Sequence, residues 1–326
     1  MKIYWIKSLT PYETLAYENI IMNDPAITGD VLLIYQHSNA IIVGNNQNTR
    51  EEINRQFVQE HNIQLARRLS GGGAVYHDLG NVCFSFITDY NKQSGYERFL
   101  TPILGFLQSL GLNAEFKGRN DILVNGAKIS GNAQYVSGNR IVSHGTLLFN
   151  VNLSILASAL NPSKIKYESK GIQSVRKRVT NIFDELPTKM DVHEFVQRLV
   201  NYFVANKHGE LVEVPAEQYA AKLAELRAKF SSEEWIYNKA ANFTFSNANK
   251  FDGGILKING NIEQGIIKEL VFEGDFLSKQ NVREIEPLFA GVKLNESAIL
   301  KVLDSIKFEE YFGTITKQEI LTLLLG

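Results

Sequence analysis

Short apolar runs and amphipathic stretches alternate along the first part of the chain. Residues 2–7, 31–36 and 40–44 are apolar runs of strand length. The sequence TPYE at residues 10–13 is a capping box with proline at the first helical position, which predicts a helix start. A second start is TREE at residues 49–52, and Ile53, Phe57 and His61 follow at a spacing of four, which predicts one continuous helix.

The middle of the chain is rich in predicted strands. Glycines separate apolar or alternating runs, and Asn125-Gly126 and Gly138-Asn139 each predict a hairpin. Because strands and helices do not alternate regularly, the pattern predicts an α+β fold with a mixed sheet rather than a doubly wound sheet. Strands are expected at 64–68, 74–77 and 82–88, and helices at 96–110, 154–160, 192–206 and 217–230.

The pattern changes after about residue 246. Two predicted strands, at 253–259 and 265–273, meet at a turn, and two helices near 282–289 and 297–306 follow them. A segment of about 80 residues is near the lower size for independent folding. We therefore predict a large domain over residues 1–246 and a small α+β domain over residues 247–326.

Composition narrows the class of protein. Lys+Arg 34 against Asp+Glu 35 gives a net charge of −1, which argues against broad nucleic-acid binding. A single cysteine rules out an internal disulfide and a zinc cage made of cysteines. No apolar run reaches the roughly 18 residues of a membrane-spanning helix, and the amino terminus lacks the features of a secretory signal. We therefore expect a cytoplasmic protein with neither membrane nor nucleic acid as partner.

The densest candidate site is the sequence RRLSGGGAVYHD at residues 67–78. Three successive glycines cost backbone entropy, so either a ligand approaches the backbone closely or the chain forms a wide bulge. With a ligand, the backbone amides and the two arginines would surround an anion. The segment is not a P-loop, because no Gly-Lys-Ser/Thr follows, and Tyr76 stands where a Rossmann fingerprint needs its third glycine.

The predicted hairpin at Asn125-Gly126 carries two charged residues. A two-residue turn pairs Asp121 with Ser130 and places both on one face together with Lys128. Asp121 and Lys128 would then lie within reach of one shared ligand. The alternative is a surface ion pair that contributes little to stability.

Three further features give a less specific indication of function. His144 heads an apolar strand, where a structural role is common, although it could form a proton-transfer pair with His77. Cys83 lies in an apolar run and is expected to be a buried structural thiol rather than a nucleophile. The basic segment at residues 169–181 could be a solvated loop, a lid that binds an anion, or a nucleic-acid patch.

Taken together, four segments resemble the lipoate–protein ligases of the biotin/lipoate ligase superfamily. They are RRLSGGGAVYHDLGN (67–81), GRNDILVNGAKISGNA (118–133), HGTLLFNVNLS (144–154) and KGIQSVRKRVTN (170–181). The resemblance covers most of residues 1–245 and implies an α+β catalytic domain with a mobile accessory domain. One departure is Asn45, which stands where many members of the family carry a basic residue.

The resemblance also implies an activity. The lipoate carboxylate would attack the α-phosphate of ATP in the presence of Mg²⁺, giving lipoyl-AMP and pyrophosphate. The lipoyl group would then pass to a lysine of a carrier protein. The implied carriers are the lipoyl domains of 2-oxoacid dehydrogenase acyltransferase subunits and the glycine-cleavage carrier protein.

The implied site is centred on Lys128, which would contact both the lipoate carboxyl group and the α-phosphate. Asp121 would be a Mg²⁺ ligand, since Mg²⁺ commonly takes one or two carboxylates together with phosphate oxygens. The other implied residues are Arg68, Gly73, Ala74, Val75 and Tyr76 for ATP, Gly72, Gly73 and His144 for lipoate, and Lys170, Gly171, Ser174 and Arg176 for a lid over the adenylate.

Three alternatives stay open at this point. An ATP-independent octanoyl or lipoyl transferase of the same fold would need a nucleophilic cysteine, and Cys83 is the sole candidate. A biotin–protein ligase is disfavoured because its Gly-Arg-Gly-Arg type of loop is absent. The third is a non-catalytic scaffold or a nucleic-acid binder using residues 176–178, and nucleic-acid affinity that weakens steeply with salt would support the binder.

Overall fold

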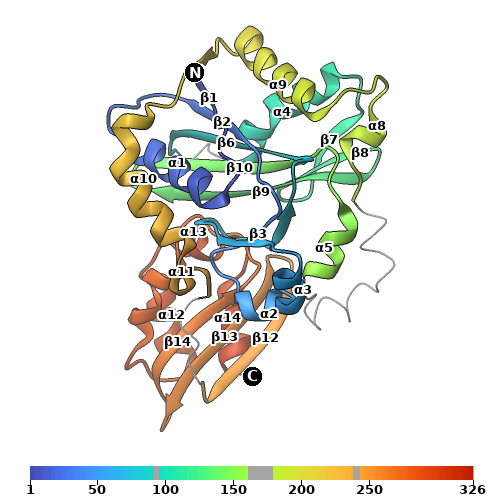
Figure 1. Ribbon diagram of the computed structural model, residues 1–326. Coiled ribbons are helices and arrows are strands. Elements are labelled where there is room, and N and C mark those ends of the chain that lie inside the picture. The colour runs from blue at the N-terminus through green and yellow to red at the C-terminus, as the bar shows by residue number, and fades with distance from the viewer. Residues whose placement is uncertain (92–94, 161–178, 238–242, 326) are drawn as a thin grey trace.

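The computed structural model describes residues 1–91, 95–160, 179–237 and 243–325. Within this part of the chain the large domain is built on an eight-stranded mixed sheet with the strand order β11-β1-β2-β6-β10-β9-β8-β7 (Figure 1). β11, β1 and β2 run parallel, and the later neighbours are antiparallel. The strands are β1 Lys2–Trp5, β2 Val31–Tyr35, β6 Asn81–Asp89, β7 Ala114–Lys117, β8 Asp121–Val124, β9 Ala127–Ser137, β10 Arg140–Leu148 and β11 Glu210–Leu211.

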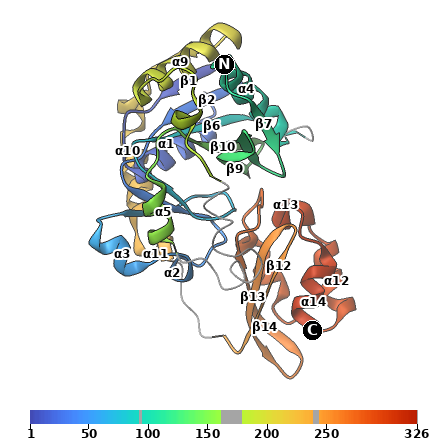
Figure 2. The ribbon, with the colours of Figure 1, turned by 90° about the vertical axis from the view of Figure 1, so that its right-hand side faces the viewer.

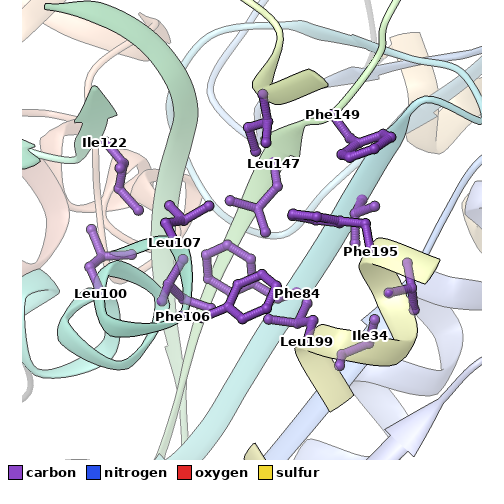
Figure 3. Packing of buried hydrophobic residues seen from close by; sticks show 14 of the residues in the cluster. Ile34, Phe84, Leu100, Phe106, Leu107, Ile122, Leu147, Phe149, Phe195 and Leu199 are labelled. Carbon is purple, nitrogen blue, oxygen red and sulfur yellow. The ribbon is translucent and has the colours of Figure 1, made fainter. Parts of the chain in front are cut away.

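Helices pack on both faces of this sheet. Leu32 and Ile34 of β2 belong to the hydrophobic cluster shared with α4 (Tyr96–Ser109) and α9 (Val192–Asn206). The intervening residues of β2 belong to the cluster shared with α1 (Pro11–Asn23) and α10 (Ala216–Ser231). Because side chains alternate along a strand, a strand covered on both faces is apolar throughout, as the sequence VLLIY shows. Figure 3 shows the first cluster, where Phe84 and Leu147 of the sheet meet Phe106 and Phe195.

The predicted helix over residues 49–61 is wrong as one element. The structure has two short helices, α2 (Thr49–Glu52) and α3 (Arg55–Glu60), separated by two extended residues, Ile53 and Asn54. The Asn54 side chain accepts a hydrogen bond from Phe57 N and so begins a new helix. The predicted starts at 10 and 96 are confirmed, although the Thr10 hydroxyl donates to Gln64 instead of capping α1.

The predicted hairpin at Asn125-Gly126 is confirmed, with one correction. Leu123 pairs with Lys128 as expected, but Asp121 pairs with Gly131, because the register shifts between Ile122 and Leu123. Ser130 is therefore opposite Ile122 and fully buried, and the prediction that it shares a face with Asp121 is wrong. The residues between the two predicted turns form one continuous strand, β9.

A second, three-stranded sheet carries the glycine-rich segment. Its order is β4-β3-β5, with β3 parallel to β4 and antiparallel to β5. Residues 68–74 connect β4 to β5 and lie between this sheet and the small domain, with a main-chain hydrogen bond from Gly72 N to Phe276 O. The bounds of these strands and of the remaining large-domain helices are β3 Ala40–Val43, β4 Gln64–Arg67, β5 Val75–His77, α5 Leu153–Ala159, α8 Ile182–Glu185 and α11 Glu233–Tyr237.

The small domain is an antiparallel three-stranded sheet with helices on one side (Figures 1 and 2). Two of its strands were predicted, and the first, β12, was not, because its sequence FSNANKF is mostly polar. β12 begins at Phe245, which pairs with Gly260, and the division at 246/247 stays a prediction. The elements are β12 Phe245–Phe251, β13 Gly254–Glu263, β14 Ile266–Gly274, η1 Val282–Glu284, η2 Glu286–Phe289, α12 Glu296–Asp304, α13 Phe308–Phe312 and α14 Lys317–Leu325.

Among the described residues, the structure contains no helix that combines the length and the apolar character needed to span a membrane.

Candidate active site

Most of the predicted site residues surround one pocket of about 190 Å³. A larger, open hollow of about 610 Å³ is lined by residues 79–80, 149–150, 183 and 189–192 and contains none of them. Leu277 of the small domain also lines the smaller pocket, so both domains contribute to its wall. The predicted residues that line it are Arg68, Gly72, Gly73, Ala74, Val75, Lys128 and His144.

Tyr76 is the predicted ATP residue whose side chain lies elsewhere. Its neighbours Val75 and His77 line the pocket, and alternation along β5 therefore turns Tyr76 to the opposite side. The ring is buried in the cluster around Val43 and Val58, and its hydroxyl donates to Asn39 Oδ1 at 3.2 Å. A contact between Tyr76 and a nucleotide would have to use its main chain.

The three glycines have different roles. A Cβ on Gly71 would lie 2.6 Å from Phe276 O, so this glycine permits the close approach of the small domain. Gly72 has φ +88°, a conformation that favours glycine. Gly73 has open space around its Cα, on the side where the pocket lies. The close approach expected from the sequence is thus made, at Gly71, by protein backbone.

This difference yields a stability prediction. Gly71→Ala should force Phe276 to shift and weaken the domain contact by about 1–3 kcal/mol, which would lower the thermal unfolding midpoint by several degrees. Gly73→Ala is the matched control, because its Cβ meets no atom within 4 Å. Equal midpoints for the two variants in calorimetry would contradict this account of Gly71.

Both arginines of the segment are buried and hold backbone in place. Arg68 donates to Ile42 O, to Gly71 O and to Gly73 O, at 3.1, 2.7 and 2.9 Å, and so fixes the shape of the glycine segment. Arg67 lies outside the pocket, so the sequence-based expectation of two arginines beside an anion is wrong for this one. Burial lowers the pKa of each guanidinium to about 10, and both therefore stay charged at neutral pH.

Lys128 and Asp121 form the ion pair that the hairpin predicts. Lys128 Nζ lies 2.8 Å from Asp121 Oδ1, and both side chains are about one-third exposed. At that exposure the pair adds little to stability, so its position at the pocket matters more than its energy. The main chain of Lys128 also forms an isolated parallel β-bridge with Val179, and Thr180 N donates a hydrogen bond to Lys128 O. The predicted lid residues Lys170, Gly171, Ser174 and Arg176 lie outside the described residues.

His144 belongs to a buried network that the sequence does not reveal. Its Nδ1 donates to Glu18 at 2.9 Å, and its Nε2 is 2.6 Å from Ser70 Oγ, which in turn accepts from Arg68 Nε. Glu18 comes from α1 and is 1% exposed, so its carboxyl group depends on such contacts, which include a hydrogen bond from Ser85 Oγ. The available signal was a charged residue three positions from Leu15 and from Ile21, among the apolar residues of a predicted helix. The suggested pairing of His144 with His77 is not formed, because His77 bonds to His37.

Cys83 is 2% exposed and lies on the inner wall of the pocket. Its sulfur accepts from Asn81 Nδ2 at 3.1 Å, and burial raises the pKa of the thiol well above its usual value. The prediction of a buried thiol is confirmed. A thiol held protonated in this way is a weak nucleophile.

The structure is a two-domain α+β chain with a lysine and a glycine segment at a pocket that both domains line, and sequence comparison gives its family. Residues 10–204 match the model "Lipoyl protein ligase A/B catalytic domain", and residues 240–324 match "Bacterial lipoate protein ligase C-terminus". Lipoate–protein ligase LplJ of Bacillus subtilis is 42% identical over 90% of each chain. Lipoate–protein ligase 1 of Staphylococcus aureus is 38% identical over 96% of each.

Solved structures agree with the fold. LipL1 of P. falciparum has a TM-score of 0.80 and 24% identity over 94% of this chain and 95% of its own. A lipoate–protein ligase A bound with ATP has a TM-score of 0.61 and 27% identity, over 72% and 98%. A bipartite ligase of Thermoplasma acidophilum, described with its E2 lipoyl domain, has a TM-score of 0.64 and 27% identity, over 74% and 98%.

This chain belongs to the lipoate–protein ligase family, and it is an enzyme of the ligase class that acts on lipoate. The resemblance drawn from the four segments is confirmed, as is the α+β fold with a small carboxy-terminal domain.

Proposed function

We propose that the enzyme activates lipoate with ATP and then transfers the lipoyl group to a carrier lysine. The observation that carries this proposal is the Lys128 ammonium at the pocket, beside the glycine segment and paired with Asp121. A solved relative is described as bound with ATP, which supports the choice of nucleotide.

The chemical difficulty of the first step is electrostatic. A lipoate carboxylate must approach a triphosphate, and charge then moves from the α-phosphate to the departing pyrophosphate. Lys128 would neutralise both reactants and hold them together, and the main-chain amides of Gly73 and Ala74, which line the pocket, would stabilise the phosphate oxygens. Arg68 would act mainly by keeping the glycine segment in its shape, since most of its donors already bind backbone oxygens.

The apolar tail of lipoate would extend along the inner wall of the pocket. Leu15, Tyr35 and Ile42 line that wall, together with the His37, His77 and Cys83 side chains. His144 lines the pocket between these residues and Lys128, with its ring held by Glu18. In this arrangement the carboxyl group would lie near Lys128 and the sulfur-bearing ring at the opposite end.

Asp121 suits a Mg²⁺ ion that is also bound to phosphate oxygens. Its carboxylate is about one-third exposed beside Lys128, and a single carboxylate with phosphate and water ligands is a common Mg²⁺ environment. When bound, the ion would supply charge neutralisation for the leaving pyrophosphate.

The second step requires a carrier with an accessible lysine. We propose the lipoyl domains of 2-oxoacid dehydrogenase acyltransferase subunits and the glycine-cleavage carrier protein as acceptors. The bipartite ligase of Thermoplasma acidophilum is described together with its E2 lipoyl domain, and this pairing supports the first class. The lysine amine would attack the mixed anhydride, and AMP would leave.

A direct product assay tests the proposal. The pure protein is incubated with ATP, Mg²⁺ and lipoate, and lipoyl-AMP and pyrophosphate are measured by mass spectrometry. The ATP-independent transferase is the competing function, and the buried, protonated Cys83 thiol argues against it. Acyl transfer that needs no ATP and is abolished by Cys83→Ala would overturn the proposal.

The metal assignment makes a separate prediction. Asp121→Asn removes a carboxylate charge, so we expect the Mg²⁺ concentration for half-maximal lipoyl-AMP formation to rise at least about tenfold. Asp252→Asn, a change in the small domain, should leave that concentration unchanged. An unaltered Mg²⁺ requirement in Asp121→Asn would remove this residue from the metal site.

A further inference from the structure

Three side chains that can bind a metal ion meet on the inner wall of the pocket. They are His37, His77 and Cys83, and one ligand atom of each lies within 4.8 Å of the other two. Their exposed fractions are 1%, 4% and 2%. All three line the pocket, so the cluster is reachable from it although it is closed to bulk solvent. Neither step of the proposed reaction uses their nitrogen or sulfur chemistry.

The contacts between the two histidines place one hydrogen between the rings. Nδ1 of His37 lies 2.9 Å from Nδ1 of His77, so one hydrogen must lie between the two nitrogens. His37 Nε2 lies 2.6 Å from Thr14 Oγ1. His77 Nε2 is buried and has no hydrogen-bond partner among the described residues. Burial lowers the pKa of His37 to about 3 and that of His77 well below its usual value, so both rings are neutral at pH 7.

The distances match those of a tetrahedral metal site. With metal–nitrogen bonds of about 2.0–2.1 Å and a metal–sulfur bond of about 2.3 Å, bound nitrogens lie roughly 3.3 Å apart, and nitrogen and sulfur roughly 3.6 Å. The structure has 2.9 Å between the two Nδ1 atoms and 3.7 Å between His77 Nδ1 and Cys83 Sγ. Shifts of about half an ångström would therefore bring these two pairs of atoms to metal-binding distances, and ligand atoms of His37 and Cys83 lie within 4.8 Å of each other.

We propose that His37, His77 and Cys83 bind a borderline or soft metal ion, for which Zn²⁺ suits the donor set best. Both rings bind through Nδ1, and the hydrogen that lies between the two Nδ1 atoms moves to Nε2 of the ring that carries it, so that each bound ring has its one hydrogen on Nε2. One proton, that of the thiol, is released for each ion bound. Three protein ligands leave the fourth coordination position facing the pocket.

A functional consequence follows, and it rests on the proposed function. If the pocket receives the acyl chain, an ion on its inner wall occupies the space of that chain's far end. The ion and the acid should exclude each other, so that Zn²⁺ inhibits competitively with the acid and not with ATP.

Cobalt substitution tests the site directly. Untagged protein, stripped of metal with a chelator, is titrated with Co²⁺ without oxygen. A tetrahedral cobalt–thiolate site gives a near-ultraviolet charge-transfer band and visible bands, saturating at one ion per chain, and Zn²⁺ should abolish them. Cys83→Ser should lose the charge-transfer band and weaken binding at least about tenfold. His61→Gln, an exposed histidine on another helix end, is the matched control and should bind as the wild type does.

Two outcomes would overturn the metal site. One is a wild-type protein without these bands, and the other is a Cys83→Ser variant with an unchanged spectrum. If that variant fails to fold, the pH dependence of the wild type decides. Since one thiol proton is released, the apparent Co²⁺ affinity should increase about tenfold for each unit by which the pH is raised, as long as the pH is below the thiol pKa. An affinity that does not change with pH would exclude thiolate binding.

Octanoate tests the exclusion, because it lacks sulfur atoms that would chelate the ion in solution. Saturating octanoate should abolish the cobalt spectrum, and a spectrum that persists with the acid bound would overturn the exclusion. The two proposals fail separately. Cobalt binding without any acid binding would contradict the proposed function and leave the metal site standing, and acid binding without cobalt binding would do the reverse.

Discussion

Lys128→Ala is expected to lower lipoyl-AMP formation at least about 10²–10³-fold, the usual cost of removing one preorganised charged contact. Transfer from added lipoyl-AMP should fall as well, because the same ammonium would contact the acyl oxygen in both steps. Lys128→Arg should not restore the rate, since a planar guanidinium cannot place its charge where the compact ammonium lies. Stopped-assay mass spectrometry of lipoyl-AMP, and of the modified carrier, measures the two steps separately.

The control for this experiment is Lys207→Ala, an exposed lysine at the end of α9. It changes net charge equally and should leave both steps unaffected. Near-normal lipoyl-AMP synthesis by Lys128→Ala would refute the central role of this residue and with it the proposed mechanism.

Arg67→Lys should destabilise the protein by about 3–5 kcal/mol, although the charge is kept. Arg67 is 1% exposed and joins the turn at residues 44–47 to the end of α11, through Nη1 bonds to Gly44, Asn45 and Gln47 oxygens and an Nη2 bond to Ile236 O. A lysine has one nitrogen and cannot reach both ends, so buried carbonyl oxygens would lose their partners.

Urea unfolding followed by circular dichroism would measure this loss as a lower midpoint. Arg55→Lys, an exposed change at the first residue of α3, is the matched control. It should change the free energy of unfolding by less than about 0.5 kcal/mol and so leave the midpoint nearly unchanged. A similar midpoint in both variants would show that the buried guanidinium is replaceable.

The sequence predicted those parts of the fold that depend on local pattern. The helix at 192–206 and the turn at Asn125-Gly126 were found because periodicity and turn chemistry act over a few residues. The register shift that buries Ser130 was not predicted, because a bulge depends on how β9 bends to pair with β8 on one side and β10 on the other. The break at Ile53 was missed because an asparagine cap outweighed a helical spacing.

The sequence likewise predicted those parts of the site that depend on residues close together in the chain. Lys128 and Asp121 are close in sequence, and the hairpin alone brings them together. Glu18 reaches His144 across 126 positions, and His37 reaches His77 across 40, so only the assembled sheet makes these contacts visible. Arg67 looked like an anion ligand because it adjoins the glycines, whereas alternation along β4 turns it away from the pocket.

The contact between the glycine segment and residues 276–278 bears on how this enzyme could be recombined with its relatives. The Gly72–Phe276 bond joins main-chain atoms, and Gly71 matters through the absence of a side chain. The Asn46 side chain also donates to Ser278 Oγ at 3.0 Å, so a carboxy-terminal domain grafted from a relative would need to reproduce the backbone path and an acceptor at position 278. Chimaeras that keep Gly71 should tolerate wide variation in the donor, while a donor with one residue inserted near position 276 should not.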